Sequence, residues 1–331
     1  MYLSLIIPVF NRPDEIDELL RSLVNADYKK EFEIVVIEDG STISCKHIIE
    51  KYQQELDISY YAKTNSGPGD SRNYGMKKAK GDYFIIFDSD CLIPNQYLST
   101  VDNYLITDFA DCFGGPDKAD ESFTDVQKAV DFAMTSLITT GGIRGASEKI
   151  TKFQPRSFNM GISKGAFEAS GGFGNIHPGE DPDLSIRLWK LGYATKLYPD
   201  AFVYHKRRIS WKKFYHQVNK FGMVRPILNK WHPQYSKMTF WFPSLFIIGL
   251  AVSVVSSIFA FWLPLILYGI YFLLIFLISF AKFQNLKISL FSVYAALIQF
   301  YGYGTGFLKS VFFINVLKQK PEQAFRKLFF K

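Results

Sequence analysis

The pattern of hydrophobic and polar positions divides the chain into two unlike parts. In the first part, short apolar runs at residues 3–9, 33–37, 58–61 and 83–87 predict strands that end at polar turns. Segments of helical period lie between them, over residues 43–56, over residues 70–80 and in a stretch that begins at Pro13. The apolar face of that stretch consists of Ile16, Leu19, Leu20 and Leu23. Strands and helices that alternate in this way predict an α/β domain with a doubly wound, mostly parallel sheet, because parallel strands need crossover connections.

The second part of the chain is strongly apolar. Residues 238–281 are 44 positions without Asp, Glu, Lys or Arg, and a helix that crosses a bilayer needs about 20. We therefore predict two spans, over residues 240–260 and 263–280, with Trp262 at the membrane interface and Pro264 opening the second helix. A buried hairpin of a soluble protein is the alternative. The predicted division is a catalytic domain at 1–232 and an α-helical membrane domain at 233–331.

A third uncharged segment, residues 288–308, leaves two topologies open. A full span would place the basic tail outside, against the positive-inside rule. The basic residues of that tail are Lys318, Lys320, Arg326, Lys327 and Lys331. Gln299 and the glycines within residues 301–306 are also unusual for a span. We predict a re-entrant or interfacial segment with the tail on the inner leaflet, and a full third span is the alternative.

The formal net charge of +7 is concentrated beside the apolar part. The basic residues before the first predicted span are Lys206, Arg207, Arg208, Lys212, Lys213, Lys220, Arg225 and Lys230. Such a stretch favours anionic lipid headgroups as its partner, so we expect a multi-pass inner-membrane protein with a cytoplasmic catalytic domain and no nucleic-acid binding. The first residues predict a strand rather than a signal peptide. The cysteines, Cys45, Cys91 and Cys112, show no zinc spacing, and we expect reduced thiols.

Polar side chains follow three of the predicted strands. Asn11, Asp39 and Asp88 each come just after a strand and should reach the same edge of the sheet, where open α/β sheets bind ligands. Asp88 and Asp90 flank Ser89, and two carboxylates this close would repel each other unless a cation neutralised them. Hard oxygen ligands suit Mg²⁺ or Mn²⁺ carrying phosphate oxygens. A solvated turn is the alternative for an isolated Asp-Ser-Asp.

Several motifs in order resemble the family-2 glycosyltransferases, which are inverting enzymes of the GT-A fold that use sugar nucleotides. The resemblance spans about residues 3–225. Its motifs are SLIIPVFNR at 4–12, EDGS at 38–41, NSGPGDSRN at 65–73, DSD at 88–90, FNMGI at 158–162, GGF at 171–173, GEDPDLSIRL at 179–188 and YH at 204–205. The family turn has Asp-Asp where this chain has Glu38-Asp39. The resemblance implies a GT-A sheet with helices on both faces.

The resemblance also implies roles for individual residues. The nucleotide-sugar contacts would come from Pro8, Phe10, Asn11, Asp39, Gly67, Arg72, Asp88 and Ser89, with Asp39 holding the base. Gly67 lets the backbone approach a ligand closely, and Arg72 is suited to the diphosphate. The metal, Mn²⁺ or Mg²⁺, would be coordinated by Asp90, with Asp88 nearer the ribose and His205 near the metal and diphosphate. The alternatives are a turn carboxylate for Asp39, a surface arginine for Arg72 and a surface histidine for His205.

Asp181 is the predicted catalytic base, with Glu180 beside it. The acceptor hydroxyl must lose its proton as it attacks, which requires a carboxylate within about 3 Å. Pro182 fits the first helical position and makes Asp181 the predicted N-cap, so simple capping is the alternative. Asp183 and Arg187 are spaced for a structural pair.

The function that these patterns predict is transfer of one sugar from a nucleotide-diphosphate donor to a hydroxyl of a lipid-linked or cell-surface glycan, as in polysaccharide biosynthesis. Transfer to a polyprenyl phosphate is the alternative within the family, and a non-catalytic membrane scaffold is the alternative outside it. QVNKF at 217–221 departs from the Q-x-x-R-W signature of processive family members at Lys220 and Phe221, which favours single-sugar transfer.

Overall fold

The computed structural model describes residues 1–118, 123–141, 152–205 and 210–330. The chain divides into two compact units, which are described separately. The first unit consists of Met1–Asp120, Glu148–Lys206 and Phe329–Lys331, and the second of Glu121–Ser147 and Arg207–Leu328. This division by packing differs from the predicted boundary at residue 232, because residues before that boundary pack with the helices that follow it.

A seven-stranded sheet forms the centre of the first unit, in the order β3-β2-β1-β4-β8-β6-β9. Its strands are β1 (Leu3–Val9), β2 (Phe32–Asp39), β3 (Ile58–Lys63), β4 (Tyr83–Phe87), β6 (Cys112–Gly114), β8 (Asn159–Ser163) and β9 (Thr195–Leu197). The four strands predicted from the sequence pair in parallel, whereas β8 runs antiparallel to both β4 and β6. The sheet is therefore mixed, and β2 and β3 extend further than predicted.

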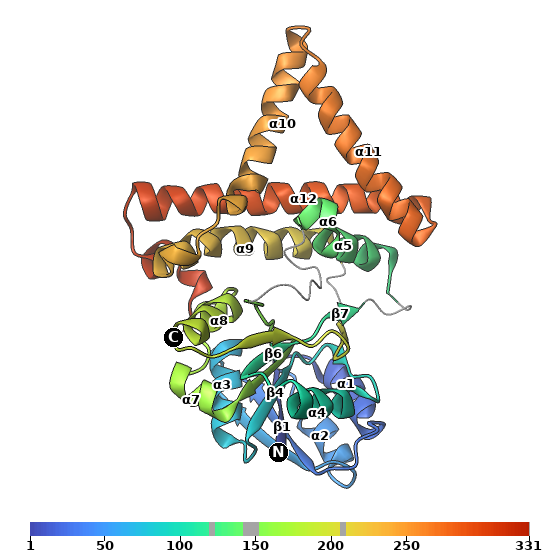
Figure 1. Ribbon diagram of the computed structural model, residues 1–331, viewed down its shortest axis with the longest axis vertical. Helices are drawn as coiled ribbons and strands as arrows, with labels where there is room; N and C mark the ends of the chain where they lie inside the picture. Colours follow the sequence, from blue (N-terminus) through green and yellow to red (C-terminus); the bar gives the residue numbers. More distant parts are fainter. Residues whose placement is uncertain (119–122, 142–151, 206–209, 331) are drawn as a thin grey trace. The chain divides into compact units, whose positions relative to one another are not determined.

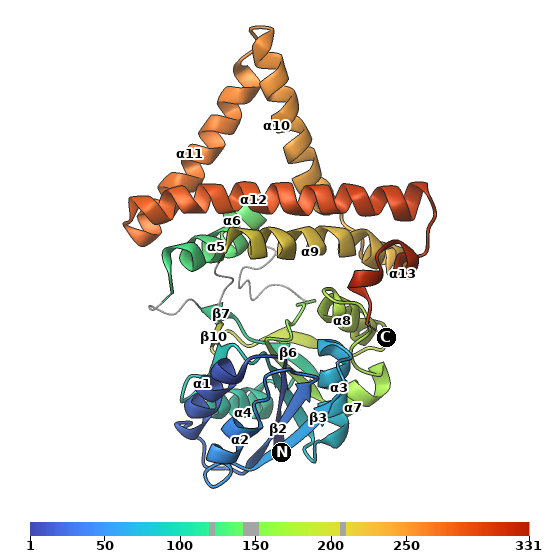
Figure 2. The ribbon, with the colours of Figure 1, turned by 180° about the vertical axis from the view of Figure 1, so that it is seen from behind.

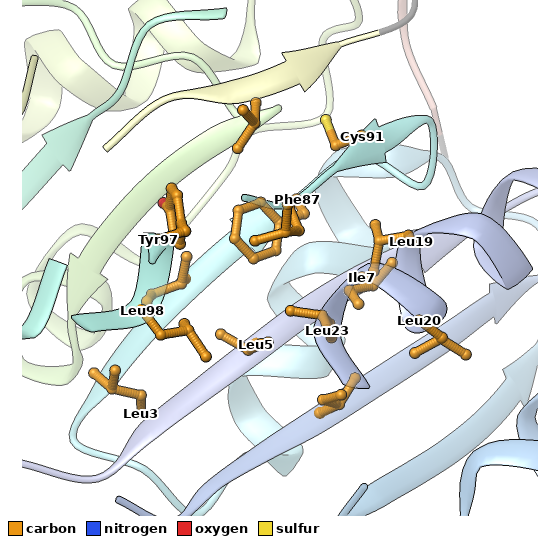
Figure 3. Packing of buried hydrophobic residues seen from close by; sticks show 14 of the residues in the cluster. Leu3, Leu5, Ile7, Leu19, Leu20, Leu23, Phe87, Cys91, Tyr97 and Leu98 are labelled. Atoms are coloured by element: carbon orange, nitrogen blue, oxygen red, sulfur yellow. The ribbon is translucent and has the colours of Figure 1, made fainter. Parts of the chain in front are cut away.

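Helices cover both faces of this sheet (Figure 1). One face carries α1 (Pro13–Val24), α2 (Lys46–Tyr52) and α4 (Tyr97–Thr107), and the other carries α3 (Pro68–Lys78), α7 (Lys164–Ser170) and α8 (Glu180–Lys190). Alternation along β1 explains the two cores, because Leu5 and Ile7 face the first set of helices and Ile6 faces the second. The predicted apolar face of α1 is confirmed, and its leucines lie against β1 in Figure 3.

A second, three-stranded sheet in the first unit consists of β5 (Cys91–Leu92), β10 (Val203–His205) and β7 (Asp117–Lys118). In this sheet His205 pairs with Cys91 across an antiparallel register. A residue late in the chain is thereby placed beside the Asp-Ser-Asp turn.

The second unit is helical. Its main helices are α5 (Asp125–Thr135), α6 (Leu137–Thr140), α9 (Trp211–Trp231), α10 (Phe242–Ile258), α11 (Leu263–Phe283), α12 (Leu286–Val311) and α13 (Pro321–Ala324). α9 and α12 lie side by side (Figures 1 and 2). A Cβ at Gly222 or Gly306 would overlap backbone oxygen of the facing helix, so glycine permits this close approach. Asn219 joins the two helices by donating to the carbonyl of Gly302 at 2.9 Å.

Among the described residues, two helices of the second unit are long and apolar enough, by length and composition alone, to cross a membrane. They cover Met238–Ile258 and Leu263–Phe283, and only 22% and 11% of their most apolar windows are buried. The third predicted segment lies within α12, whose buried residues contact α9, α5 and α10. Of the basic stretch before the first predicted span, Lys212 to Lys230 lie on α9, and residues 206–208 lie outside the described residues.

Candidate active site

The carboxyl ends of β1 and β2 carry loops organised by two of the predicted residues. The Asn11 side-chain oxygen accepts from the backbone N–H of Thr42 at 2.7 Å. The Asp39 carboxylate accepts from Lys63 Nζ at 2.7 Å and from the N–H of Gly67 at 3.0 Å. Both side chains therefore hold the loops that surround the site. Pro8 is half-buried in β1 and Phe10 is 49% exposed at its end.

The two carboxylates of the Asp-Ser-Asp turn are held by different arginines. Asp90 forms an ion pair with Arg12 and lies with its Oδ1 3.2 Å from His205 Nε2. Asp88 instead accepts from Arg72 Nη2 at 2.7 Å, and Ser89 between them is buried. The predicted metal set is thus only partly assembled, because Asp90 and His205 meet while Asp88 is held by Arg72.

Donor atoms of three residues at the Asp-Ser-Asp turn lie close enough together to hold a metal ion. Ligand atoms of Asp90, Cys91 and His205 all lie within 4.8 Å of one another. Burial raises the pKa of the Cys91 thiol well above its usual value, and its Sγ lies 3.4 Å from the carbonyl of Phe158, so Cys91 is a poor ligand. A carboxylate and an imidazole remain: the carboxylate suits Mn²⁺ or Mg²⁺, and the imidazole suits borderline metals such as Zn²⁺.

Arg72 connects the Asp-Ser-Asp turn to the start of α8. Its guanidinium is buried, lies 3.3 Å from Glu180 Oε1 through Nη1, and is placed over the ring of Phe173. Although burial disfavours its charge, Asp88 and Glu180 raise the Arg72 pKa above its usual value. Glu180 also lies 2.7 Å from His177 Nδ1. A buried arginine therefore neutralises acids from two motifs that are far apart in the sequence.

Asp181 is not the cap of α8. The helix begins at Glu180 after Gly179, which has a φ of 120°, and no side-chain cap is formed. The prediction that Asp181 is the N-cap is therefore wrong: Pro182 lies two positions further into the helix than expected. Asp181 Oδ2 accepts from the N–H of Ser157 at 3.2 Å, whereas its buried Oδ1 has no hydrogen-bond partner among the described residues. The predicted pair of Asp183 and Arg187 is confirmed at 2.9 Å.

The two acids at the start of α8 have opposite pKa shifts. Burial and the neighbouring charge of Glu180 raise the pKa of Asp181 to about 6, partly offset by Arg72 and Arg156. Burial also acts on Glu180, but His177 and Arg72 outweigh it and hold the Glu180 pKa below its usual value. A carboxylate that has a free oxygen and a pKa near neutrality is suited to accept a proton. Glu180 is suited to stay ionised and to pair with Arg72 and His177.

Three residues of this arrangement were not predicted as site residues: Arg12, Ser157 and His177. Arg12 directly follows Asn11 and His177 lies three residues before Glu180, so proximity to a predicted residue was the available signal. Ser157 reaches Asp181 through its backbone, which no side-chain pattern reveals.

The acids of this site lie beyond the carboxyl ends of the strands, which is where open α/β sheets bind their ligands. The family model described as "Glycosyl transferase family 2" matches residues 4–170, and the model described as "Glycosyl transferase family group 2" matches residues 147–279. The chain belongs to glycosyl transferase family 2.

Curated relatives match a limited part of the chain. Poly(ribitol-phosphate) beta-N-acetylglucosaminyltransferase TarS of Staphylococcus aureus is 42% identical over 101 residues, which is 30% of this chain and 18% of TarS. Poly(ribitol-phosphate) beta-glucosyltransferase of Bacillus spizizenii is 38% identical over 102 residues, 30% of this chain and 16% of that protein. The matched region thus spans less than a fifth of either relative.

Solved structures share the fold. Mannosyltransferase PcManGT from Pyrobaculum calidifontis, in complex with GDP-Man and Mn²⁺, has a TM-score of 0.60 at 15% identity and covers 90% of this chain and 86% of its own. TarS 1–349 of S. aureus in complex with UDP-GlcNAc has a TM-score of 0.51 at 20% identity, covering 96% and 93%. These likenesses support the GT-A assignment.

Proposed function

We propose that the chain is an inverting glycosyltransferase that moves one sugar from a nucleotide-diphosphate donor to a hydroxyl of a glycan acceptor. The observation that carries this proposal is the state of Asp181, whose buried Oδ1 has no hydrogen-bond partner among the described residues and whose pKa is raised to about 6. The names of the relatives support a uridine-nucleotide sugar as donor and a polyol-phosphate or other cell-surface polymer as acceptor.

In this mechanism Asp181 accepts the proton of the acceptor hydroxyl. The bond between the acceptor oxygen and the anomeric carbon forms as the bond between that carbon and the diphosphate oxygen breaks. The nucleoside diphosphate leaves with the electron pair, on the face opposite the acceptor. Asp181 is held for this task by the Ser157 N–H on Oδ2, which leaves Oδ1 for the incoming hydroxyl.

The charge of the leaving diphosphate must also be stabilised. Asp90 and His205 would hold a divalent ion, which neutralises phosphate charge when it is bound. Arg72 supplies a permanent positive charge next to Asp88. Asp39 keeps the loop at Gly67 in place and is proposed to accept from the base of the donor.

We also propose that α10 and α11 insert into the inner membrane with the first unit on the cytoplasmic side. Large apolar side chains are exposed along both helices, among them Val255, Ile266 and Leu273. Lys287, which follows α11 in the sequence, forms an ion pair with Asp125 of α5 at 2.9 Å. We expect this charged pair to lie outside the apolar part of the membrane. Because α12 is covered by α9, α5 and α10, this arrangement favours the interfacial placement of the third segment over a full span.

The exposed hairpin favours one further candidate, transfer to a polyprenyl phosphate. Such an acceptor is already ionised and needs no general base, so Asp181 would not be required for the transfer step. The two candidates therefore predict different results when Asp181 is replaced.

A thermal-shift screen of the full chain in detergent tests the proposal at the level of binding. UDP-GlcNAc, UDP-glucose and GDP-mannose are each compared with and without Mn²⁺, and with EDTA. A ligand that binds only the folded state raises its apparent stability, by about 2.7 kcal/mol at a hundredfold excess over Kd. A metal-dependent rise with one sugar nucleotide supports the proposal, and no rise with any nucleotide contradicts it.

A further inference from the structure

The segment Phe329–Phe330 belongs to the first unit, although the residues before it belong to the second. The N–H of Phe330 donates to the carbonyl of Asn175 at 2.9 Å, and Phe329 forms an antiparallel bridge with Ile176. The segment is therefore fixed by backbone hydrogen bonding against the loop that leads into α8.

This fixation places the Phe330 ring between two loops of the candidate site. On one side the ring covers Gly67, and a Cβ at that position would overlap it. On the other side its centroid lies 6.1 Å from that of the His177 imidazole, at an interplanar angle of 57°. Gly67 is the residue whose N–H is held by Asp39, and His177 is the residue that lies against Glu180. The ring thus joins the loop predicted to hold the nucleotide to the turn that carries the acids.

The surroundings of this ring differ from those of a core phenylalanine. Phe84, Phe87 and Phe113 of the same unit are at most 1% exposed, whereas Phe330 is half-buried. The ring contacts include a glycine and an imidazole. An aromatic ring that keeps an accessible surface beside a glycine is suited to pack against a flat ligand, because every nucleobase offers an apolar face.

We propose that Phe330 is a donor-positioning residue, whose ring forms the apolar wall against which the nucleobase of the donor packs. The inference rests on the proposed function, since it requires a nucleotide near Asp39. It extends that function, because it assigns part of the donor site to a segment more than 250 residues away from Asp39 in the sequence. Phe330 takes no part in the chemical step.

The test is the affinity of the full chain for UDP in the presence of Mn²⁺, measured by titration calorimetry for the wild type, Phe330→Ala, Phe330→Tyr and Phe330→Trp. Base stacking predicts that Phe330→Ala raises the Kd about 5- to 20-fold, whereas the two aromatic variants stay within about twofold of the wild type. In turnover assays Phe330→Ala is expected to raise the donor KM and to change kcat little. Phe109→Ala is the matched control, since it removes a 47%-exposed phenyl ring of the same unit that packs against Tyr83.

Each outcome decides between distinct accounts. An unchanged Kd in Phe330→Ala, or a tighter one that marks the ring as an obstruction, overturns the inference while the proposed function stands. A wild type that binds no nucleotide overturns the proposed function and the inference with it. If Phe330→Ala has a lowered melting temperature, the aromatic variants still decide, because packing against a base requires their rings to restore affinity.

Discussion

Arg72 lies with its Nη2 2.7 Å from Oδ1 of Asp88, 16 residues away in the sequence. The same guanidinium lies 3.3 Å from Glu180 and is almost fully buried. The acids of the strand end and of α8 are therefore tied together by one positive charge inside the protein. This relationship makes the site a single electrostatic unit.

Replacing Arg72 by Met should destabilise the first unit strongly. Removing one partner of a buried ion pair leaves an uncompensated charge, at a cost of about 3–5 kcal/mol. Arg72→Lys keeps the charge but loses the planar fork and should cost less. Thermal unfolding of the full chain at pH 7.5 measures the difference, with Arg21→Met, on the exposed side of α1, as the control. Equal melting temperatures for Arg72→Met and Arg21→Met would show that Arg72 does not serve this role.

The rate of transfer should depend on pH through the ionisation of Asp181. Because Asp181 must be deprotonated to act as a base, kcat/KM should rise as the pH increases through about 6, the value to which its pKa is raised. Glu180→Gln removes the neighbouring negative charge, which lowers the Asp181 pKa and should move the rise in kcat/KM to lower pH. A rise that stays at the same pH or moves to higher pH in Glu180→Gln would contradict its assignment to the ionisation of Asp181.

Arg12 should compete with the metal for Asp90. The ion pair of Arg12 with Asp90 neutralises the carboxylate when no ion is bound. Despite burial, His205 and Arg12 together hold the Asp90 pKa well below its usual range. Arg12→Gln should therefore bind Mn²⁺ more tightly in the absence of nucleotide, by roughly tenfold for about 1.4 kcal/mol of lost competition. Electron paramagnetic resonance of free Mn²⁺ measures this, and Arg21→Gln, on the exposed side of the helix that Arg12 precedes, is the control. Weaker Mn²⁺ binding in Arg12→Gln would mean that Arg12 supports the metal site.

The proposed topology predicts which positions face the outside of intact cells. A cysteine in place of Trp262, at the turn between α10 and α11, should react with a membrane-impermeant maleimide added outside. A cysteine in place of Lys318, after α12, should react only after the membrane is opened. Strong labelling of the Lys318→Cys variant from outside would indicate a full third span.

Local sequence patterns correctly predicted helices and strands in the N-terminal half of the first unit. The apolar face of α1 and the parallel pairing of the first four strands both depend on periodicity along the sequence, which can be read directly. The antiparallel β8 and the meeting of His205 with Asp90 depend on pairing between distant segments, β4 with β8 and β5 with β10. Such pairing has no local signature, so the position of β8 was not predicted and the neighbours of His205 were known only by resemblance.

The separate partners of Asp88 and Asp90 could not be predicted for a similar reason. Two acids two residues apart suggest a shared ion, but each carboxylate points to a different arginine. Arg12 directly precedes α1 and Arg72 lies on α3, and only the folded sheet brings both of them to the turn. The split of Glu180 and Asp181 into two roles likewise depends on which acid reaches Arg72 and His177.

Replacement of Asp181 by Asn tests the central claim, and its effect on stability serves as the control for folding. A carboxyl group whose folded pKa is raised binds more protons in the native state, so its contribution to stability is lost as the pH rises through about 6. Asp181→Asn should therefore raise the melting temperature at pH 7.5 relative to the wild type and show a smaller difference near pH 4. A variant that meets this expectation is folded.

The most direct measurement is the transfer rate of Asp181→Asn with a hydroxyl acceptor, taken together with its affinity for UDP and Mn²⁺. Loss of general base catalysis predicts a fall in kcat of about 10²–10⁴-fold with an unchanged nucleotide Kd. Transfer that stays within tenfold of the wild type would contradict the account, because Asp181 would then not be the base and an acceptor that is already ionised would fit the site better.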